Sequence, residues 1–278
     1  SENCTGDFIS NSKNCENCYD VSDSEDLKYV QVGIQTKDLM DCSNMYVKPE
    51  LSYEVLGTIG TYNVHFCLYV FNSSNLLYCE SCYGSQNCFG CIALRNKKYC
   101  IFNKQYTQEE YERLVPKIIE QMMKTGEWGE YFPCEISPLA YNESVANEYY
   151  PLSKEEVLKL GYRWKEIEDI TAPIGQAVAV PENIKDVPDD ICEKVLTCGK
   201  CNKNYKIMKY ELDFYRKMNL PVPKRCSNCR YFARLSLRPQ RKLFDRNCSN
   251  CAEKMRSVYS KDSPEIVYCE KCYLKEVY

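Results

Sequence analysis

Residues 198–272 contain four Cys-x-x-Cys pairs, and no other residues in the chain are better suited to bind a metal. Two such pairs separated by a loop form the tetrathiolate cage of a structural zinc site, and here the loops contain 24 and 17 residues. Both lengths suit a zinc ribbon, in which each pair lies on a tight turn. We therefore expect two zinc ions per chain, with sequential pairing favoured and cross-braced pairing as the alternative. The predicted ligands are Cys198, Cys201, Cys226, Cys229, Cys248, Cys251, Cys269 and Cys272.

The residues that a zinc or thiol enzyme requires are missing. Zinc catalysis needs an open coordination position and usually a His or carboxylate ligand. The chain has one histidine, His65, at a variable position of a repeat described below, where a packing or surface role is expected. It contains no His-x-Glu pair of the deaminase type and no cysteine with a neighbouring histidine. A dithiol redox role for Cys198-Gly-Lys-Cys201 lacks a βαβ context. We therefore predict that the protein is not an enzyme.

Charge is distributed unevenly along the chain. Residues 1–191 contain 16 Lys and Arg against 30 Asp and Glu, whereas residues 192–278 contain 20 against 9. Between Lys224 and Arg246 the cations alternate with aromatic residues, a combination typical of RNA or single-stranded DNA binding, because cations contact phosphates and rings stack on unpaired bases. A solvated face, or docking of the basic part on the acidic part, is the alternative. The predicted nucleic-acid-binding residues are Arg225, Arg230, Tyr231, Phe232, Arg234, Arg238, Arg241 and Lys242.

A repeat in the first hundred residues sets the expected fold. The segment Ser12–Cys18 recurs at a step of 12 residues, with one inserted residue near Gly57–Gly60, and every second copy matches better, which gives a period of about 24. Like residues at a constant step predict a parallel β-solenoid of about four coils over residues 12–106, with Asn, Asp, Ser and Gly at its corners. The aligned columns are Cys18, Cys42, Cys67, Cys91; Val21, Met45, Val70, Leu94; Leu27, Leu51, Leu76, Cys100; and Tyr29, Tyr53, Tyr78, Phe102.

Two further Cys-x-x-Cys pairs lie inside this repeat. Cys79, Cys82, Cys88 and Cys91 have the spacing of a third zinc site. In the 24-residue register, however, the two pairs belong to different halves of a coil and face different walls. We therefore favour packing, with cysteine acting as a small buried apolar residue, over a third metal ion.

Two capping boxes mark helices after the repeat. Thr107 with Glu110 precedes apolar residues at helical spacing, which predicts a helix over residues 108–125, with Pro116 as the candidate kink, that plugs the open end of the solenoid. Ser153 with Glu156 opens a second, short helix. The expected fold is mainly β, divided into a solenoid (1–106), a helical cap and connecting region (107–170), a proline-containing linker (171–190), ribbon 1 (191–245) and ribbon 2 (246–278).

Residues 196–235 carry a resemblance to a known family. The Cys198-Gly-Lys-Cys201 turn, the helix motif Glu211-Leu-Asp-Phe-Tyr215 and Pro223-Lys-Arg-Cys-Ser-Asn-Cys-Arg230 resemble the small bacterial "probable zinc-ribbon" domain. Asn202 stands where that family usually has Gly, and because Asn also tolerates a positive φ, we expect the turn to form.

Residues 248–272 are similar to short bacterial zinc ribbons, with Ala252 in place of the usual Gly. The order of Cys-rich repeats, helix and paired ribbons is similar to that of uncharacterised proteins of uncultured bacterial lineages. These resemblances imply zinc binding and no particular activity.

The cysteine spacing also bears on location and function. Cysteines two residues apart do not easily form a disulfide without strain, so we expect a reducing compartment, the cytoplasm, and no membrane association. Two hypotheses follow. The first is a non-enzymatic zinc-binding protein that binds RNA or single-stranded DNA through its basic ribbons. The alternative is a protein-interaction scaffold that uses the solenoid surface, with zinc purely structural.

Overall fold

The chain folds into two compact units, seen in a computed structural model that describes residues 1–166 and 178–277. Unit 1 contains Ser1–Arg163 and Gln240–Tyr278, and unit 2 contains Trp164–Pro239. This division differs from the predicted one, because residues 240–245 were assigned to ribbon 1 and belong instead to the unit that contains the solenoid. No helix among the described residues is both long and apolar enough to cross a bilayer.

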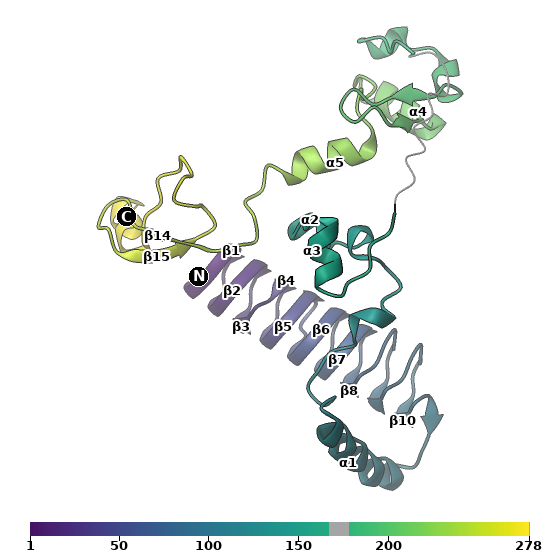
Figure 1. The fold of residues 1–278 in the computed structure, drawn as a ribbon, viewed down its shortest axis with the longest axis vertical. Coiled ribbons are helices and arrows are strands. Elements are labelled where there is room, and N and C mark those ends of the chain that lie inside the picture. The colour runs from purple at the N-terminus through teal and green to yellow at the C-terminus, as the bar shows by residue number, and fades with distance from the viewer. Residues whose placement is uncertain (167–177, 278) are drawn as a thin grey trace. The chain divides into compact units, whose positions relative to one another are not determined.

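Unit 1 begins with the predicted parallel β-solenoid, whose strands stack along one axis (Figure 1). Successive turns pair at an offset of 12 residues, as in Cys15 with Leu27 and Leu76 with Cys88, and there are about 8 turns. Each predicted 24-residue coil is therefore two stacked turns. The strands are β1 (Glu2–Ser10), β2 (Lys13–Ser22), β3 (Glu25–Lys28), β4 (Gln31–Ile34), β5 (Lys37–Tyr46), β6 (Glu50–Ile59), β7 (Tyr62–Phe71), β8 (Ser74–Leu77), β9 (Gln86–Phe89), β10 (Lys98–Ile101) and the antiparallel β11 (Lys104–Gln105).

A left-handed residue at nearly every third position turns the chain. Between residues 63 and 75 the residues with positive φ are Asn63, Phe66, Tyr69, Asn72 and Asn75. Each 12-residue turn is therefore four-sided, and each side has one inward residue, one outward residue and one corner residue. Asn and Asp tolerate positive φ better than other non-Gly residues. Exposed corner asparagines also bond between turns, since Asn63 Nδ2 donates to Asn75 Oδ1 at 2.8 Å.

The inward residues form the solenoid core. The predicted column of Cys18, Cys42, Cys67 and Cys91 is at most 1% exposed, which confirms it. In the predicted second column Val21, Met45 and Val70 are buried and Leu94 is partly buried. Another inward column consists largely of Ser and Thr, whose hydroxyls donate to a carbonyl two residues earlier and accept from the next turn. Ser24 Oγ, for example, accepts from the Thr36 backbone N at 3.0 Å and donates to the Ser22 carbonyl at 2.7 Å.

The inserted residue lies at Val47–Pro49 and not near Gly57–Gly60. Gly33 pairs with Met45 at an offset of 12, but Lys37 pairs with Glu50 at an offset of 13. The extra residue is absorbed where Val47 and Lys48 both have positive φ.

Because the insertion was predicted too late in the chain, two of the predicted columns contain the wrong residue in the turn that follows Pro49. Ser52 faces inward at 3% exposed, whereas the predicted Leu51 is a corner residue at 40%. In the predicted aromatic column Tyr29, Tyr78 and Phe102 are corner residues outside the core, and Tyr53 is out of line with them.

Helix α1 (Gln108–Thr125) follows the solenoid as predicted. Its capping box is present, with the Glu110 backbone N donating to Thr107 Oγ1 at 3.2 Å. Tyr111 and Val115 of α1 pack with Phe89 and Ile101 in a cluster separate from the solenoid interior. The helix therefore covers outward-facing side chains of the last turns, rather than inserting into the end of the core.

Short helices complete unit 1 before the chain leaves it. The predicted second capping box is present, because the Glu156 backbone N donates to Ser153 Oγ. The elements are η1 (Cys134–Ile136), η2 (Tyr141–Glu143), α2 (Ala146–Tyr149) and α3 (Lys154–Lys159). After Gln240 the chain returns to unit 1 as β14 (Phe244–Asn247), β15 (Lys254–Ser257) and α6 (Glu270–Val277).

Unit 2 has its own small core. Ile184, Val187 and Ile191 are buried together with Leu196 and Leu212. The described part of the predicted linker, residues 178–190, therefore belongs to the core of ribbon 1, while residues 171–177 lie outside the described residues. The elements are η3 (Ile184–Asp186), η4 (Asp189–Cys192), β12 (Leu196–Thr197), β13 (Asn204–Tyr205), α4 (Lys209–Lys217) and α5 (Ser227–Leu235).

The corner positions make the first testable prediction. Asn75→Val should lower the free energy of unfolding by about 1–2 kcal/mol, because a β-branched residue is strained at the positive φ of this corner. The matched control is Ser74→Val in β8, which places the same side chain at an extended position and should change stability by less than about 0.5 kcal/mol. Urea unfolding followed by circular dichroism compares the two variants. Equal loss of stability in the two variants would contradict the assignment of Asn75 to a corner and Ser74 to an extended position.

Candidate metal centres

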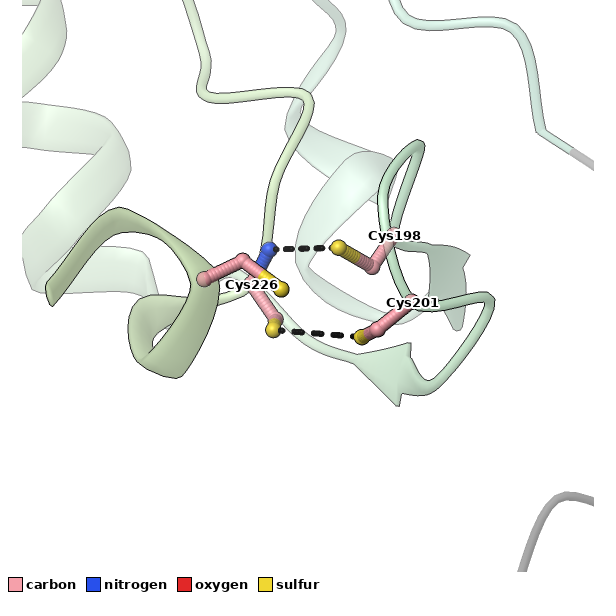
Figure 2. Close-up of side chains that lie close together, drawn as sticks. Cys198, Cys201 and Cys226 are labelled. Atoms are coloured by element: carbon pink, nitrogen blue, oxygen red, sulfur yellow. Dashed lines mark hydrogen bonds between the residues drawn. The ribbon is translucent and has the colours of Figure 1, made fainter. Parts of the chain in front are cut away.

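The first group of cysteines joins a hairpin turn to the start of a helix. Cys198 and Cys201 lie on the turn between β12 and β13, and Cys226 and Cys229 lie at the start of α5. The four sulfur atoms all lie within 4.8 Å of one another. In Figure 2 the Cys226 backbone N donates to Cys198 Sγ at 3.3 Å, and the Sγ atoms of Cys201 and Cys226 are 3.8 Å apart.

The second group repeats this arrangement in unit 1. Cys248 and Cys251 lie on the turn between β14 and β15, Cys269 immediately precedes α6, and Cys272 lies in its first turn. The Cys269 backbone N donates to Cys248 Sγ at 3.2 Å, and the Sγ atoms of Cys251 and Cys269 are 3.6 Å apart. The two groups are thus built on one plan, and each combines sequential pairs. Sequential pairing is therefore confirmed for these eight cysteines.

The same backbone bond fixes the turn in both groups. The Gly199 N–H donates to the Lys224 carbonyl at 3.0 Å, and the Ser249 N–H donates to the Val267 carbonyl at 2.9 Å. Asn202 has a φ of 57° and Ala252 a φ of 60°, so each turn closes through a left-handed residue. The expectation that Asn202 preserves the turn is confirmed.

The sulfur geometry and acidity suit a metal ion. Four sulfurs at about 2.3 Å from a tetrahedral metal are about 3.8 Å apart, close to the observed distances. Burial disfavours the Cys198 thiolate, but backbone N–H groups outweigh it and lower the pKa of Cys198 to about 6. Backbone N–H groups likewise lower the pKa of Cys248 to about 6. Hydrogen bonding with neighbouring thiols, first Cys201, raises the pKa of Cys229 to about 12, and a bound cation would favour the thiolate instead.

The four cysteines of the alternative third site are packed in the solenoid core. Cys79, Cys82, Cys88 and Cys91 are each 0% exposed. Each half of the 24-residue period is a complete turn, so Cys79 and Cys91 lie in one column on successive turns. The prediction that the two cysteine pairs face different walls of the solenoid was therefore wrong. Among residues 1–166 and 178–277, the groups of three or more ligand atoms within 4.8 Å are the two described above.

The predicted nucleic-acid residues are divided between the two units. Unit 2 contains Arg225 before α5, then Arg230, Tyr231, Phe232 and Arg234 on α5, and Arg238 after it. Tyr231 and Phe232 are 38% and 48% exposed. Arg241 and Lys242 belong to unit 1, so the eight residues do not form one continuous segment of one unit.

Arg241 is used within unit 1. Its side chain is 9% exposed, and its guanidinium donates to Asp20 Oδ2 at 2.7 Å and to Gln31 Oε1 at 2.9 Å. It also stacks on the Tyr149 ring, 3.8 Å from the centroid. These contacts join the segment after Gln240 to the first turns of the solenoid, so Arg241 is not one of the exposed cations of α5, and its part in nucleic-acid binding stays a prediction. Its partners lie up to 221 positions away in the sequence, so no local pattern indicated them.

No protein-family model matches the chain, and no curated protein is similar to it. The resemblance of residues 196–235 to the bacterial zinc-ribbon domain therefore stays a prediction that depends on their own residues.

The two groups should bind metal independently. We expect two metal equivalents per chain, and Cys226→Ser and Cys269→Ser should each remove one, because each destroys one tetrathiolate cage. Cys79→Ser, a matched change in the solenoid core, should leave both in place. Elemental analysis of the desalted full chain measures the equivalents. Loss of metal in the Cys79 variant would contradict the assignment.

Proposed function

We propose that both cysteine groups hold zinc and that unit 2 is a single-stranded nucleic-acid-binding module. Four thiolates at tetrahedral spacing are the usual ligands of structural zinc, and they leave no coordination position open. Zinc would hold the start of α5 against the β12–β13 turn. Because metal-bound thiolates need a reducing environment, the cytoplasm is the compartment that suits this role.

The charge of the ribbon 1 segment carries the nucleic-acid proposal. Residues 192–239 contain 12 Lys and Arg against 3 Asp and Glu, whereas residues 240–278 contain 8 against 6. The basic excess of the C-terminal third therefore belongs to unit 2. Arg225 and Arg234 are exposed, and no ion pair among the described residues involves either of them. Such cations can contact phosphates.

Exposed aromatic side chains in unit 2 supply the second requirement. Phe232 on α5 is joined by two residues of α4 that the sequence did not assign to nucleic-acid binding, Tyr210 and Phe214, which are 72% and 53% exposed. A spacing of four residues places Tyr210 and Phe214 on one face of α4. Each ring can stack on an unpaired base at about 1–3 kcal/mol, without sequence preference.

A non-enzymatic role fits the remaining chemistry. His65, the one histidine in the chain, lies beside Asn63 Oδ1 at 2.9 Å, and burial lowers its pKa. Neither cysteine group includes a histidine or carboxylate ligand. We therefore assign zinc a structural role.

Binding should depend on salt and on the exposed cations. A labelled 12-nucleotide RNA or DNA should bind the zinc-loaded chain, and affinity should fall linearly with salt on a logarithmic scale. The double variant Arg225→Gln, Arg234→Gln should lower the slope by about 1.4, because each single-strand phosphate contact contributes about 0.7. Phe232→Ala should weaken binding about tenfold at every salt concentration. Fluorescence anisotropy measures all three.

The control removes the same charge from the same unit. Lys185 and Lys194 lie close in sequence to Asp186, Asp189 and Asp190, whose carboxylates repel phosphate. The double variant Lys185→Gln, Lys194→Gln should therefore bind the oligonucleotide as the unchanged protein does. Salt-independent binding, or equal loss in both double variants, would contradict the proposal.

The scaffold alternative has one observation in its favour. Five successive turns place an apolar side chain at the same outward position, with Ile34, Ile59 and Tyr83 exposed. The rings of Phe71 and Tyr83 stack at 4.9 Å. The full ladder is Ile34, Tyr46, Ile59, Phe71 and Tyr83.

A protein partner should bind through this ladder if the solenoid is the functional surface. The variant Ile59→Glu, Phe71→Glu should then abolish capture of the partner, because two charges would be buried in the interface. Arg225→Gln, Arg234→Gln should leave capture intact. Co-purification compares the two, and the opposite pattern would exclude the scaffold.

A further inference from the structure

A basic pocket lies in unit 1, where the residues after Gln240 meet the first turns of the solenoid. Its volume is about 450 Å³, within the range of about 300–1,000 Å³ typical of small-ligand sites. Of the described residues that line it, none is Asp or Glu, although the solenoid that forms one wall belongs to the acidic part of the chain. Its charged and aromatic lining consists of Tyr19, Tyr29, Tyr150, Arg241, Lys242 and Arg256.

We propose that this pocket binds a nucleoside phosphate, with the phosphate on the cations and the base against the tyrosines. The inference does not depend on nucleic-acid binding by unit 2, because every lining residue belongs to unit 1. The ligand comes either from a free nucleotide or from the phosphorylated end of a strand, since both present the same chemistry.

The cations differ in how they are held. Arg241 is fixed by Asp20 and Gln31, yet its buried Nε–H has no acceptor among the described residues, which leaves an unsatisfied donor beside the pocket. Lys242 and Arg256 are exposed and make no ion pair within the described part of the chain. Two exposed cations beside one fixed guanidinium suit a phosphate dianion.

Arg256 lies close to the aromatic wall. Burial, then the nearby Tyr150 and Asp7, raise the pKa of the Tyr19 hydroxyl, and the Arg256 guanidinium opposes this rise. Tyr19 is 4% exposed, and its hydroxyl lies 3.1 Å from Asn17 Oδ1, so the ring is held in place. The cationic and aromatic parts of the pocket are therefore within reach of one small ligand.

Two tyrosines leave ring surface accessible. Tyr29 and Tyr150 are 44% and 42% exposed. Gln31 Nε2 donates to the Tyr150 hydroxyl at 2.5 Å, and Gln31 Oε1 accepts from Arg241. Through Gln31 the orientation of an aromatic side chain is thus coupled to that of a cation, and both are set before a ligand arrives. Such preorganisation reduces the entropy that binding would otherwise lose.

Calorimetry on the full zinc-loaded chain tests the pocket with adenosine 5′-monophosphate as the probe. We expect the monophosphate to bind, and adenosine and inorganic phosphate each to bind at least about tenfold more weakly, because each lacks one half of the recognition. Arg256→Gln should weaken monophosphate binding about tenfold, and Tyr29→Leu should do the same. Lys254→Gln, on the same strand and also exposed but outside the pocket, should bind like the unchanged protein.

The outcomes are distinct from those for unit 2. Arg225→Gln, Arg234→Gln should leave monophosphate binding unchanged, so either proposal can fail alone. Competition by a 5′-phosphorylated oligonucleotide, but not by its unphosphorylated form, identifies a strand end as the source, and lack of competition identifies a free nucleotide. No binding of the monophosphate, equal binding of adenosine, or equal weakening by Lys254→Gln would overturn the proposal.

Discussion

The left-handed residue at nearly every third position is the constraint on which the rest of unit 1 depends. Because the chain turns after three residues, each turn offers only four inward positions, and the space they enclose is narrow. Side chains such as Cys, Val, Leu, Ser and Thr fill it, with Met45 among the largest. Ten of the twenty cysteines lie in this part of the chain, and nine of them are buried. Their abundance there follows from their size.

A narrow interior also explains what lies outside the solenoid. Aromatic side chains such as Phe66, Tyr78 and Phe89 do not fit inside, so they lie at the corners or on the outer faces, and other segments must cover them. Helix α1 covers Phe89, and the Trp128 ring contacts those of Phe66 and Tyr78 at 5.9 and 6.1 Å. The solenoid is therefore completed by chain that follows it, which buries apolar surface on the outside as well as the inside.

Local patterns were predictable from the sequence, and distant contacts were not. The cysteine pairs, the turn at Asn202 and the helix over residues 108–125 are set by residues within a few positions of one another. The 24-residue period was misleading because alternate turns happen to share cysteines, whereas the shorter triplet signal is carried by Asn and Asp at the corners. The contact of Arg241 with Asp20 forms only when the whole of unit 1 folds, so no local pattern could indicate it. For this reason the sequence predicted one continuous basic surface between residues 224 and 246, although this segment is divided between two units.

The three-residue side of each solenoid turn also explains why the Cys-x-x-Cys spacing occurs both in the packed core and at the predicted metal sites. On a turn whose sides have three residues, Cys-x-x-Cys places its thiols on adjacent inward positions, as in Cys79 and Cys82. In the solenoid interior the Cys42 thiol donates to the Met40 carbonyl, with the sulfur and oxygen atoms 3.1 Å apart, and burial disfavours its thiolate. On the ribbon turns the sulfur faces backbone N–H groups, as Cys226 N donates to Cys198 Sγ at 3.3 Å, which favours the thiolate. Burial accordingly raises the pKa of Cys42 to about 12, whereas that of Cys198 is about 6. The Cys-x-x-Cys spacing alone therefore does not identify a metal ligand in this chain, because Cys79 and Cys82 in the solenoid core share it with Cys198 and Cys201 on a ribbon turn.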